Sequence, residues 1–186
     1  LLANHELSQL TRRGITKGHG NVVEMFNAGV EWAFGSESEM VCEAIDTFIL
    51  AMPLAAKSSS GLMCCHSLPN AILMNRFDKD IFSRSLTDED RDGTDGSASL
   101  LVWGRSYTEE QVDELSTEWD VKLFCLGHAH VPDGAEVAMK NILLLNSDHD
   151  QGAVLPVDLG DIPDAETAIW SVIKLSALPI EPDHAS

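Results

Sequence analysis

The stretch CLGHAHVP, residues 125–132, joins an apolar run to two histidines that are two positions apart. The run Val121 to Leu126 has the length and apolar character of a buried β-strand. One histidine after such a strand is more often a satisfied core residue than a ligand, but a Gly-His-x-His arrangement favours a binding site. In extended backbone, side chains two residues apart point the same way, so His128 and His130 can face one site. Gly127 would let the chain turn tightly before the pair.

Two other polar positions also follow apolar runs. Asn4 and His5 follow Leu1-Leu2, and His66 follows residues 62–65. In an open α/β sheet, ligands bind where the strand ends open into loops, so side chains far apart in sequence can converge there. Imidazole nitrogens and amide oxygens are ligands that Zn, Mn and Fe accept. An H-x-H pair can supply one ligand to each ion of a two-metal site.

Composition limits the class of protein. The chain has 186 residues and a formal net charge of −18, which argues against nucleic acid as a partner because phosphate contacts need Lys and Arg. Phosphate binding would need a metal ion to offset the negative field locally. We expect the acidic patch at residues 88–92 to be a solvated surface. No apolar run approaches the roughly 18 residues of a membrane span, so no membrane association is expected.

Cysteine usage and length predict the setting and the domain count. None of the four cysteines forms a C-x-x-C motif, which favours a reduced, cytoplasmic protein over a disulfide framework. The length suits one domain, which we place over residues 1–178, followed by a tail over residues 179–186.

Hydrophobic periodicity predicts an α/β fold. The helices at 21–34 and 37–52 should face the core, although they could also form part of a cap over a site. Residues 12–20 and 87–98 should be loops, and residues 70–86 a mixed segment. Helices are expected at 21–34, 37–52 and 108–119, and strands at 61–65, 99–103, 121–126, 141–146, 152–158 and 168–175.

Together, these motifs resemble the calcineurin-like metallophosphoesterase superfamily. Ala3-Asn4-His5-Glu6 is similar to its G-N-H-E motif, Cys65-His66-Ser67-Leu68-Pro69 to its strand ending in H-G-G-x-x-P, and Gly127-His128-Ala129-His130 to its G-H-x-H motif. Trp103-Gly104-Arg105 resembles the W-x-R stretch of the bacterial Ser/Thr protein phosphatase-like branch, and residues 141–158 resemble the closing hairpin. The resemblance implies a sandwich of two mixed β-sheets flanked by helices, here lacking the N-terminal strands.

The resemblance also implies an activity and a role for each site residue. The activity is hydrolysis of phosphate esters by a hydroxide that bridges two divalent ions (Mn, Fe or Zn). Asn4, His66 and His128 would ligate one ion, and His130 the other. His5 would transfer a proton near the leaving oxygen, and Arg105 would grip the phosphate. The substrate would be a phosphorylated small molecule or a phosphoprotein.

Two motifs of the superfamily, D-x-H and G-D-x-x-D, are missing from the chain. We expect them upstream of Leu1, and without their ligands we expect this chain to be inactive by itself. Two alternatives stay open: a non-catalytic or single-metal remnant that serves as a binding module, and a phosphodiesterase or dinucleoside-polyphosphate hydrolase. Asp148-His149-Asp150 falls where the superfamily has a hairpin, so we expect a solvated turn there. His19 and His184 belong to no motif.

Overall fold

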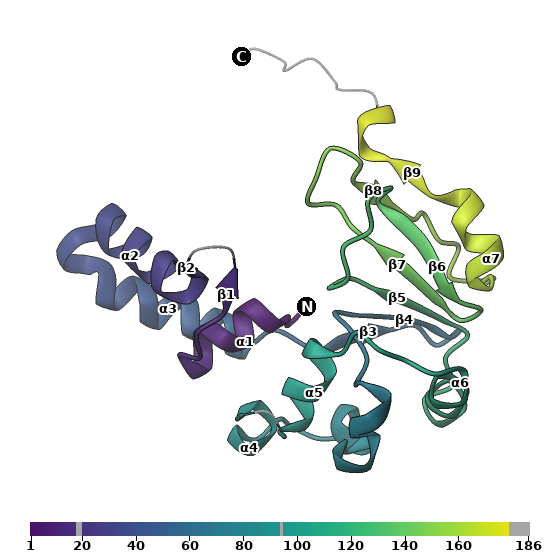
Figure 1. Ribbon diagram of the computed structural model, residues 1–186, viewed down its shortest axis with the longest axis horizontal. Helices are drawn as coiled ribbons and strands as arrows, with labels where there is room; N and C mark the ends of the chain where they lie inside the picture. The colour runs from purple at the N-terminus through teal and green to yellow at the C-terminus, as the bar shows by residue number, and fades with distance from the viewer. Residues whose placement is uncertain (18–19, 94, 179–186) are drawn as a thin grey trace. The chain divides into compact units, whose positions relative to one another are not determined.

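The protein is α/β, with a mixed five-stranded sheet flanked by helices, in a computed structural model that describes residues 1–17, 20–93 and 95–178 (Figure 1). The expected fold class is therefore confirmed, whereas the metallophosphoesterase-type sandwich stays a prediction. The chain divides into two compact units. Unit 1 comprises Leu1–Ala56 and Cys65–Tyr107, and unit 2 comprises Lys57–Cys64 and Thr108–Ser186.

Two compact units are compatible with one domain or with two, so the single domain over 1–178 stays a prediction. The expected tail, residues 179–186, lies outside the described residues, as do His19 and His184. Within the described ranges, every helix is too short or too polar to span a lipid bilayer.

Unit 1 is mainly helical. Its helices are α1 (Asn4–Thr11), α2 (Val22–Phe34), α3 (Ser38–Leu50), α4 (Asp88–Arg91) and α5 (Ser97–Trp103), and its 3-10 turns are Gly35–Glu37, Ala71–Arg76 and Lys79–Ser83. A two-stranded antiparallel ribbon, β1 (Thr16–Lys17) and β2 (Gly20–Asn21), precedes α2. The Asn21 side chain accepts a hydrogen bond from the Val23 N–H, which caps the start of α2. Gly35, at a φ of +54°, ends α2.

The helices α2 and α3 confirm the expected helical segments but not their expected burial. Only Val23, Val30 and Ile49 are buried along the two helices. The prediction that both helices face the core is therefore wrong for most of their apolar side chains. The large apolar residues left exposed are Met25, Phe26, Trp32, Phe34, Met40, Phe48 and Leu50.

Most of the strands belong to the five-stranded sheet, with the order β3-β4-β5-β7-β6. β5 pairs with β7 in parallel, and β7 pairs with β6 antiparallel. β8 and β9 form a separate antiparallel pair. The bounds are β3 (Ala55–Lys57), β4 (Leu62–Cys65), β5 (Leu123–Leu126), β6 (Ala135–Met139), β7 (Ile142–Leu145), β8 (Ala153–Val154) and β9 (Ile173–Lys174).

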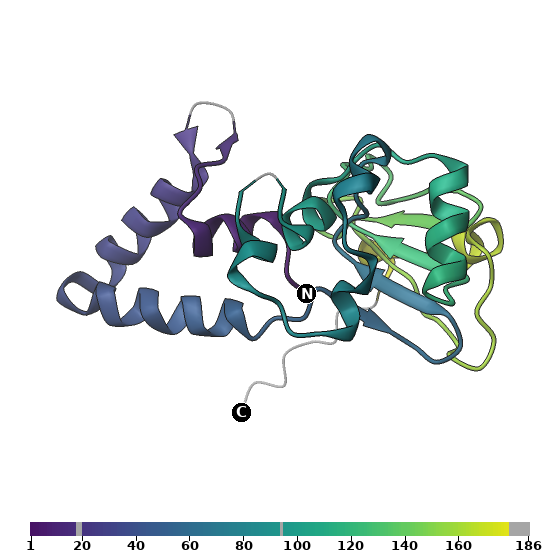
Figure 2. The same cartoon turned by 90° about the horizontal axis from the view of Figure 1, so that it is seen from below.

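Two helices of unit 2 cover the sheet. Helix α7 (Ala165–Ala168) buries Ala165 and Ala168 against Leu123 and Leu143 of the sheet. Helix α6 (Glu109–Glu118) lies on the other face (Figures 1 and 2). Thr108 accepts a hydrogen bond from the Gln111 N–H, which caps the start of α6.

The structure corrects four expected segments. Residues 99–103 lie in helix α5, not in a strand: residues 97–102 are all buried, and a helix buried on every side has the same continuous apolar pattern as a buried strand. Half of residues 168–175 lie in α7 and a 3-10 turn, because Asp164 caps a helix just before them, and the expected strand is reduced to β9. Residues 152–158 contribute only the short strand β8. Asn4 begins helix α1 and does not follow a strand.

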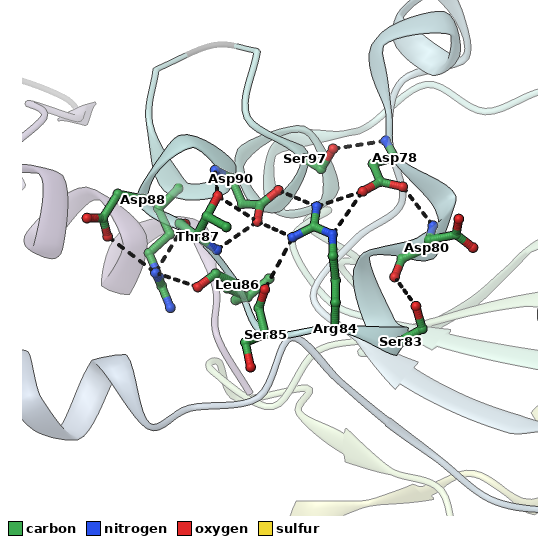
Figure 3. A network of polar contacts seen from close by, with 11 residues as sticks. Asp78, Asp80, Ser83, Arg84, Ser85, Leu86, Thr87, Asp88, Asp90 and Ser97 are labelled. Carbon is green, nitrogen blue, oxygen red and sulfur yellow. Dashed lines mark hydrogen bonds and ion pairs between the residues drawn. The ribbon is translucent and has the colours of Figure 1, made fainter.

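The segment 87–98, expected to be a loop, instead begins with α4. The acidic patch is solvated as expected at Asp88, Glu89 and Asp92, but not at Asp90. Thr87 and Asp90 form a reciprocal capping box at its start. Asp90 is buried, and both of its carboxylate oxygens accept hydrogen bonds from the Arg84 guanidinium, at 2.6 and 2.8 Å (Figure 3). Arg84 also binds Asp78, so one guanidinium joins two segments of unit 1.

Candidate functional site

Asn4 and His66, predicted to ligate one metal ion, lie in direct contact in unit 1. The Asn4 Oδ1 and His66 Nε2 atoms are 2.8 Å apart. Asn4 is buried at the first position of α1, and His66 directly follows β4. An amide oxygen can only accept a hydrogen bond, so His66 Nε2 donates in this contact. Two residues of separate predicted motifs therefore converge within one unit.

The surroundings of His66 keep its imidazole neutral. Burial lowers the pKa of His66 to about 4, and the nearby charges of His5 and Arg105 act in the same direction. A neutral imidazole is the form that ligates a metal ion, so His66 needs no deprotonation at neutral pH. His5 and Arg105 therefore lie close enough to His66 for their charges to act on it.

The position of Arg105 is set by close packing between residues 66–70 and 104–107. A Cβ atom added to Gly104 would lie 1.6 Å from the Leu68 carbonyl oxygen, so only glycine fits there. The buried Ser67 hydroxyl donates to the Gly104 carbonyl and lies 2.8 Å from the Tyr107 hydroxyl. Ser67, noted in the sequence only as a departure from the superfamily's glycine, thus holds this segment.

Asn70 completes the link between these two segments. Its Oδ1 accepts hydrogen bonds from the backbone N–H groups of Arg105 and Ser106, at 2.8 and 2.9 Å. The Ala71 N–H donates to the Ser106 carbonyl in return. These hydrogen bonds fix the backbone position of Arg105, while the residue itself is exposed. That arrangement suits a guanidinium that binds a phosphate.

In unit 2, the predicted pair His128 and His130 lies in a tight turn after β5. The turn is closed by a 2.7 Å hydrogen bond from the Ala129 N–H to the Gly127 carbonyl. The residue with positive φ is His128 itself, at +59°, and not Gly127, so the expected role of the glycine is corrected. A left-handed backbone is uncommon outside glycine, and strained residues concentrate at functional sites.

Two side chains that the motif does not include hold this turn. Asn146, after β7, accepts from the Val131 N–H and donates to the Ala129 carbonyl. His149 accepts from the Gln151 N–H at Nδ1, so its Nε2 donates to the Val131 carbonyl at 3.0 Å. The His149 and His130 rings also meet edge to face, with centroids 5.3 Å apart. The solvated turn expected at residues 148–150 is confirmed for Asp148 and Asp150, which are exposed, but not for His149, which is half-buried and bonded.

The donors in each unit fit a divalent transition metal in type: an amide oxygen and an imidazole in unit 1, and two imidazoles in unit 2. In the part of the chain that the structure describes, no three His, Cys, Asp or Glu side chains are arranged to hold a metal ion. Each unit by itself therefore offers fewer than the three protein ligands of a catalytic zinc site.

No protein-family model matches the chain, and no curated protein is significantly similar to it.

Proposed function

We propose that this chain carries the metal-binding and phosphate-binding residues of a metal-dependent phosphoesterase that acts on phosphate monoesters. The observation that carries the proposal is the 2.8 Å contact between Asn4 Oδ1 and His66 Nε2. These residues are 62 positions apart in the chain, and the resemblance to the metallophosphoesterases assigns both to the same ion.

The proposed metal ligands are Asn4 and His66 in unit 1 and His128 and His130 in unit 2. They would hold two divalent ions, Mn, Fe or Zn, which the borderline character of imidazole suits. When bound, such ions polarise a phosphoryl oxygen and activate water. The free state of all four cysteines supports a reducing, cytoplasmic setting.

The protein's own groups would bind the substrate and move a proton. Arg105 binds two non-bridging phosphate oxygens through its planar guanidinium, a geometry that lysine cannot reproduce. His5 donates a proton to the leaving oxygen, which lowers the energy of the departing alkoxide. His66, held neutral by its surroundings, keeps its lone pair for a metal ion instead of taking part in this proton transfer.

Calorimetric titration of the 186-residue chain with Mn²⁺ tests the proposal. We expect His66→Ala and His128→Ala each to weaken Mn²⁺ binding at least tenfold, because each removes a ligand atom. His184→Ala is the matched control, since His184 belongs to no motif, and should leave the affinity unchanged. Equal effects from all three variants would mean that the acidic surface binds Mn²⁺ without a site, which would refute the proposal.

Hydrolysis assays with Mn²⁺ separate the proposal from its alternatives. 4-Nitrophenyl phosphate reports phosphomonoesterase activity, and bis(4-nitrophenyl) phosphate reports phosphodiesterase activity. The alternative of a single-metal binding module predicts a different outcome. Binding of one ion at most, with no hydrolysis of either ester even when the upstream coding sequence is included, would support that module.

A further inference from the structure

A pocket of about 310 Å³ opens beside His5 in unit 1. Helix α1 lines one side of it with His5, Glu6 and Gln9, and the α2–α3 hairpin lines the other with Val22, Val23, Phe26 and Ile49. A cavity of this volume is large enough for a small molecule, and its mix of apolar walls and a few polar groups is typical of ligand sites.

The walls of the pocket are held by polar contacts between helices. The amides of Gln9 and Asn27 bind each other reciprocally, at 2.9 and 3.1 Å, and so join α1 to α2. An ion pair of 2.5 Å between Arg12 and Asp46 joins the end of α1 to α3. Both walls are therefore fixed relative to each other, and a ligand would not have to order them.

The charge of the lining selects against anions. Among the residues that line the pocket, Glu6 carries a carboxylate, and none is Lys or Arg. Glu6 Oε2 is buried and accepts no hydrogen bond from any group that the structure describes. Because the lining holds a carboxylate and neither Lys nor Arg, a ligand that brings an N–H, an O–H or a positive charge is favoured there. A second phosphate group would be repelled.

Helix α1 connects this pocket to the predicted metal ligands. Asn4 contacts His66, while the next residue, His5, lines the pocket. We propose that the pocket receives the leaving group of the ester, a small amphipathic alcohol with an apolar body and a neutral or cationic donor group. This inference rests on the proposed phosphoesterase function and specifies its substrate class.

The oxygen of a water molecule forms a bond to phosphorus, and the bond from phosphorus to the alcohol oxygen breaks. His5 gives a proton to that oxygen, and the proton released by the water restores His5. Inorganic phosphate and the free alcohol are the products, and the alcohol stays in the pocket beside Glu6 until it dissociates. A dinucleoside polyphosphate does not fit, because its leaving group is itself an anionic phosphate.

Binding of product-like alcohols tests the pocket without requiring turnover. Tyramine and 4-hydroxyphenylacetate share a phenol ring but carry opposite charges. By calorimetry on the full chain, we expect tyramine to bind at least tenfold more tightly than 4-hydroxyphenylacetate. Phe26→Ala, which removes an apolar wall, and Glu6→Gln, which removes the carboxylate, should each lower the affinity for tyramine about tenfold. Trp32, on the same helix as Phe26, is exposed and lies outside the pocket. Trp32→Ala should therefore leave the affinity for tyramine unchanged.

A second titration tests whether the bound alcohol is the leaving group. With Mn²⁺ present, O-phosphotyramine should bind at least tenfold more tightly than tyramine, and Arg105→Ala should remove that gain. Equal binding of the cationic and anionic alcohols would overturn the inference while leaving the Mn²⁺ titration free to support the phosphoesterase. Binding of tyramine with no gain from the phosphate would overturn the leaving-group assignment. Loss of Mn²⁺ site binding alone would refute the proposed function.

Discussion

Gly104 fixes the backbone position of the neighbouring Arg105, because the backbone at Gly104 packs against the Leu68 carbonyl with no space for a side chain. Its importance follows from close approach and not from backbone freedom, since the only glycines with positive φ among the described residues are Gly35, Gly61, Gly93 and Gly134. A proposed phosphate-binding arginine thus depends on a neighbour that makes no contact with any substrate.

We expect Gly104→Ala to destabilise the protein by about 3 kcal/mol or more, because the new methyl group would overlap a backbone oxygen that cannot move away cheaply. Gly29→Ala is the matched control. Nothing lies within 4 Å of a Cβ at Gly29, in the middle of α2, so that variant should gain about 0.5–1 kcal/mol from helix propensity. Urea unfolding of both variants measures the two changes. Equal stabilities would contradict the packing seen at Gly104.

Asn146 plays the corresponding part in unit 2, and its loss should loosen the turn that carries the histidine pair. We expect Asn146→Ala to lower the affinity for Mn²⁺ about tenfold, because partners that orient metal ligands have effects of this size. Asn141→Ala, which removes a contact between Asn141 Nδ2 and Ser116 Oγ elsewhere in unit 2, is the control. An unchanged affinity in Asn146→Ala would show that the turn holds its shape without this side chain.

For single residues, the sequence indicates candidate site residues but not the side chains that position them. The G-H-x-H and N-H-E patterns singled out His128, His130, Asn4 and His5, because short motifs keep functional residues together. The contact of Asn4 with His66 was predicted only through the resemblance. Residues such as Asn146 leave no local signal, since their partners are brought near only by the fold.

Among the elements, helix α5 could not be predicted from hydrophobic periodicity. A helix that is polar on one side, such as α6, has a pattern that a strand cannot reproduce, and it was predicted correctly. Residues 97–102 of α5 are buried throughout, so their sequence carries no such contrast. The strand β6 was missed for the opposite reason, because its residues alternate between half-buried and exposed without a strong apolar face.

The short helix α4 is stabilised by the Arg84–Asp90 ion pair together with its capping box. The hydrogen bonds from Arg84 hold the pKa of Asp90 well below its usual range. A carboxyl with a lowered pKa in the folded state stabilises the protein above its unfolded pKa, about 3.9 for Asp. That contribution is lost as the pH falls below this value toward the folded pKa.

We therefore expect Asp90→Asn to destabilise the protein at pH 7 and pH 5, and the difference from the unmodified chain to shrink below about pH 4. Urea midpoints at pH 7, 5 and 3 measure this. Asp95→Asn breaks an ion pair whose side chains are both more than half exposed and should have little effect at any of these pH values. A difference for Asp90→Asn that stays constant with pH would mean that the Arg84 pair does not stabilise the fold.

For the whole molecule, the net charge of −18 opposes anionic ligands and attracts cations of every kind. The helices α2 and α3 contribute strongly to this charge: residues 22–50 contain six acidic residues and no Lys or Arg. Any stabilisation by a divalent ion therefore has to be separated from simple screening. Ionic strength and the choice of ion provide that separation, because a ligand site depends on donor chemistry and screening does not.

We expect Mn²⁺ at about a hundredfold excess over its dissociation constant to stabilise the folded chain by about 2.7 kcal/mol, and EDTA to reverse the gain. NaCl at equal ionic strength should reproduce little of the effect. Ca²⁺, which prefers oxygen ligands, should also fall short, because imidazoles form most of the proposed donor set. His66→Ala and His128→Ala should each reduce the Mn²⁺ shift in the thermal midpoint, whereas His184→Ala should not. If Ca²⁺ matched Mn²⁺ in every variant, the stabilisation would come from the acidic surface and the histidines would have no part in it.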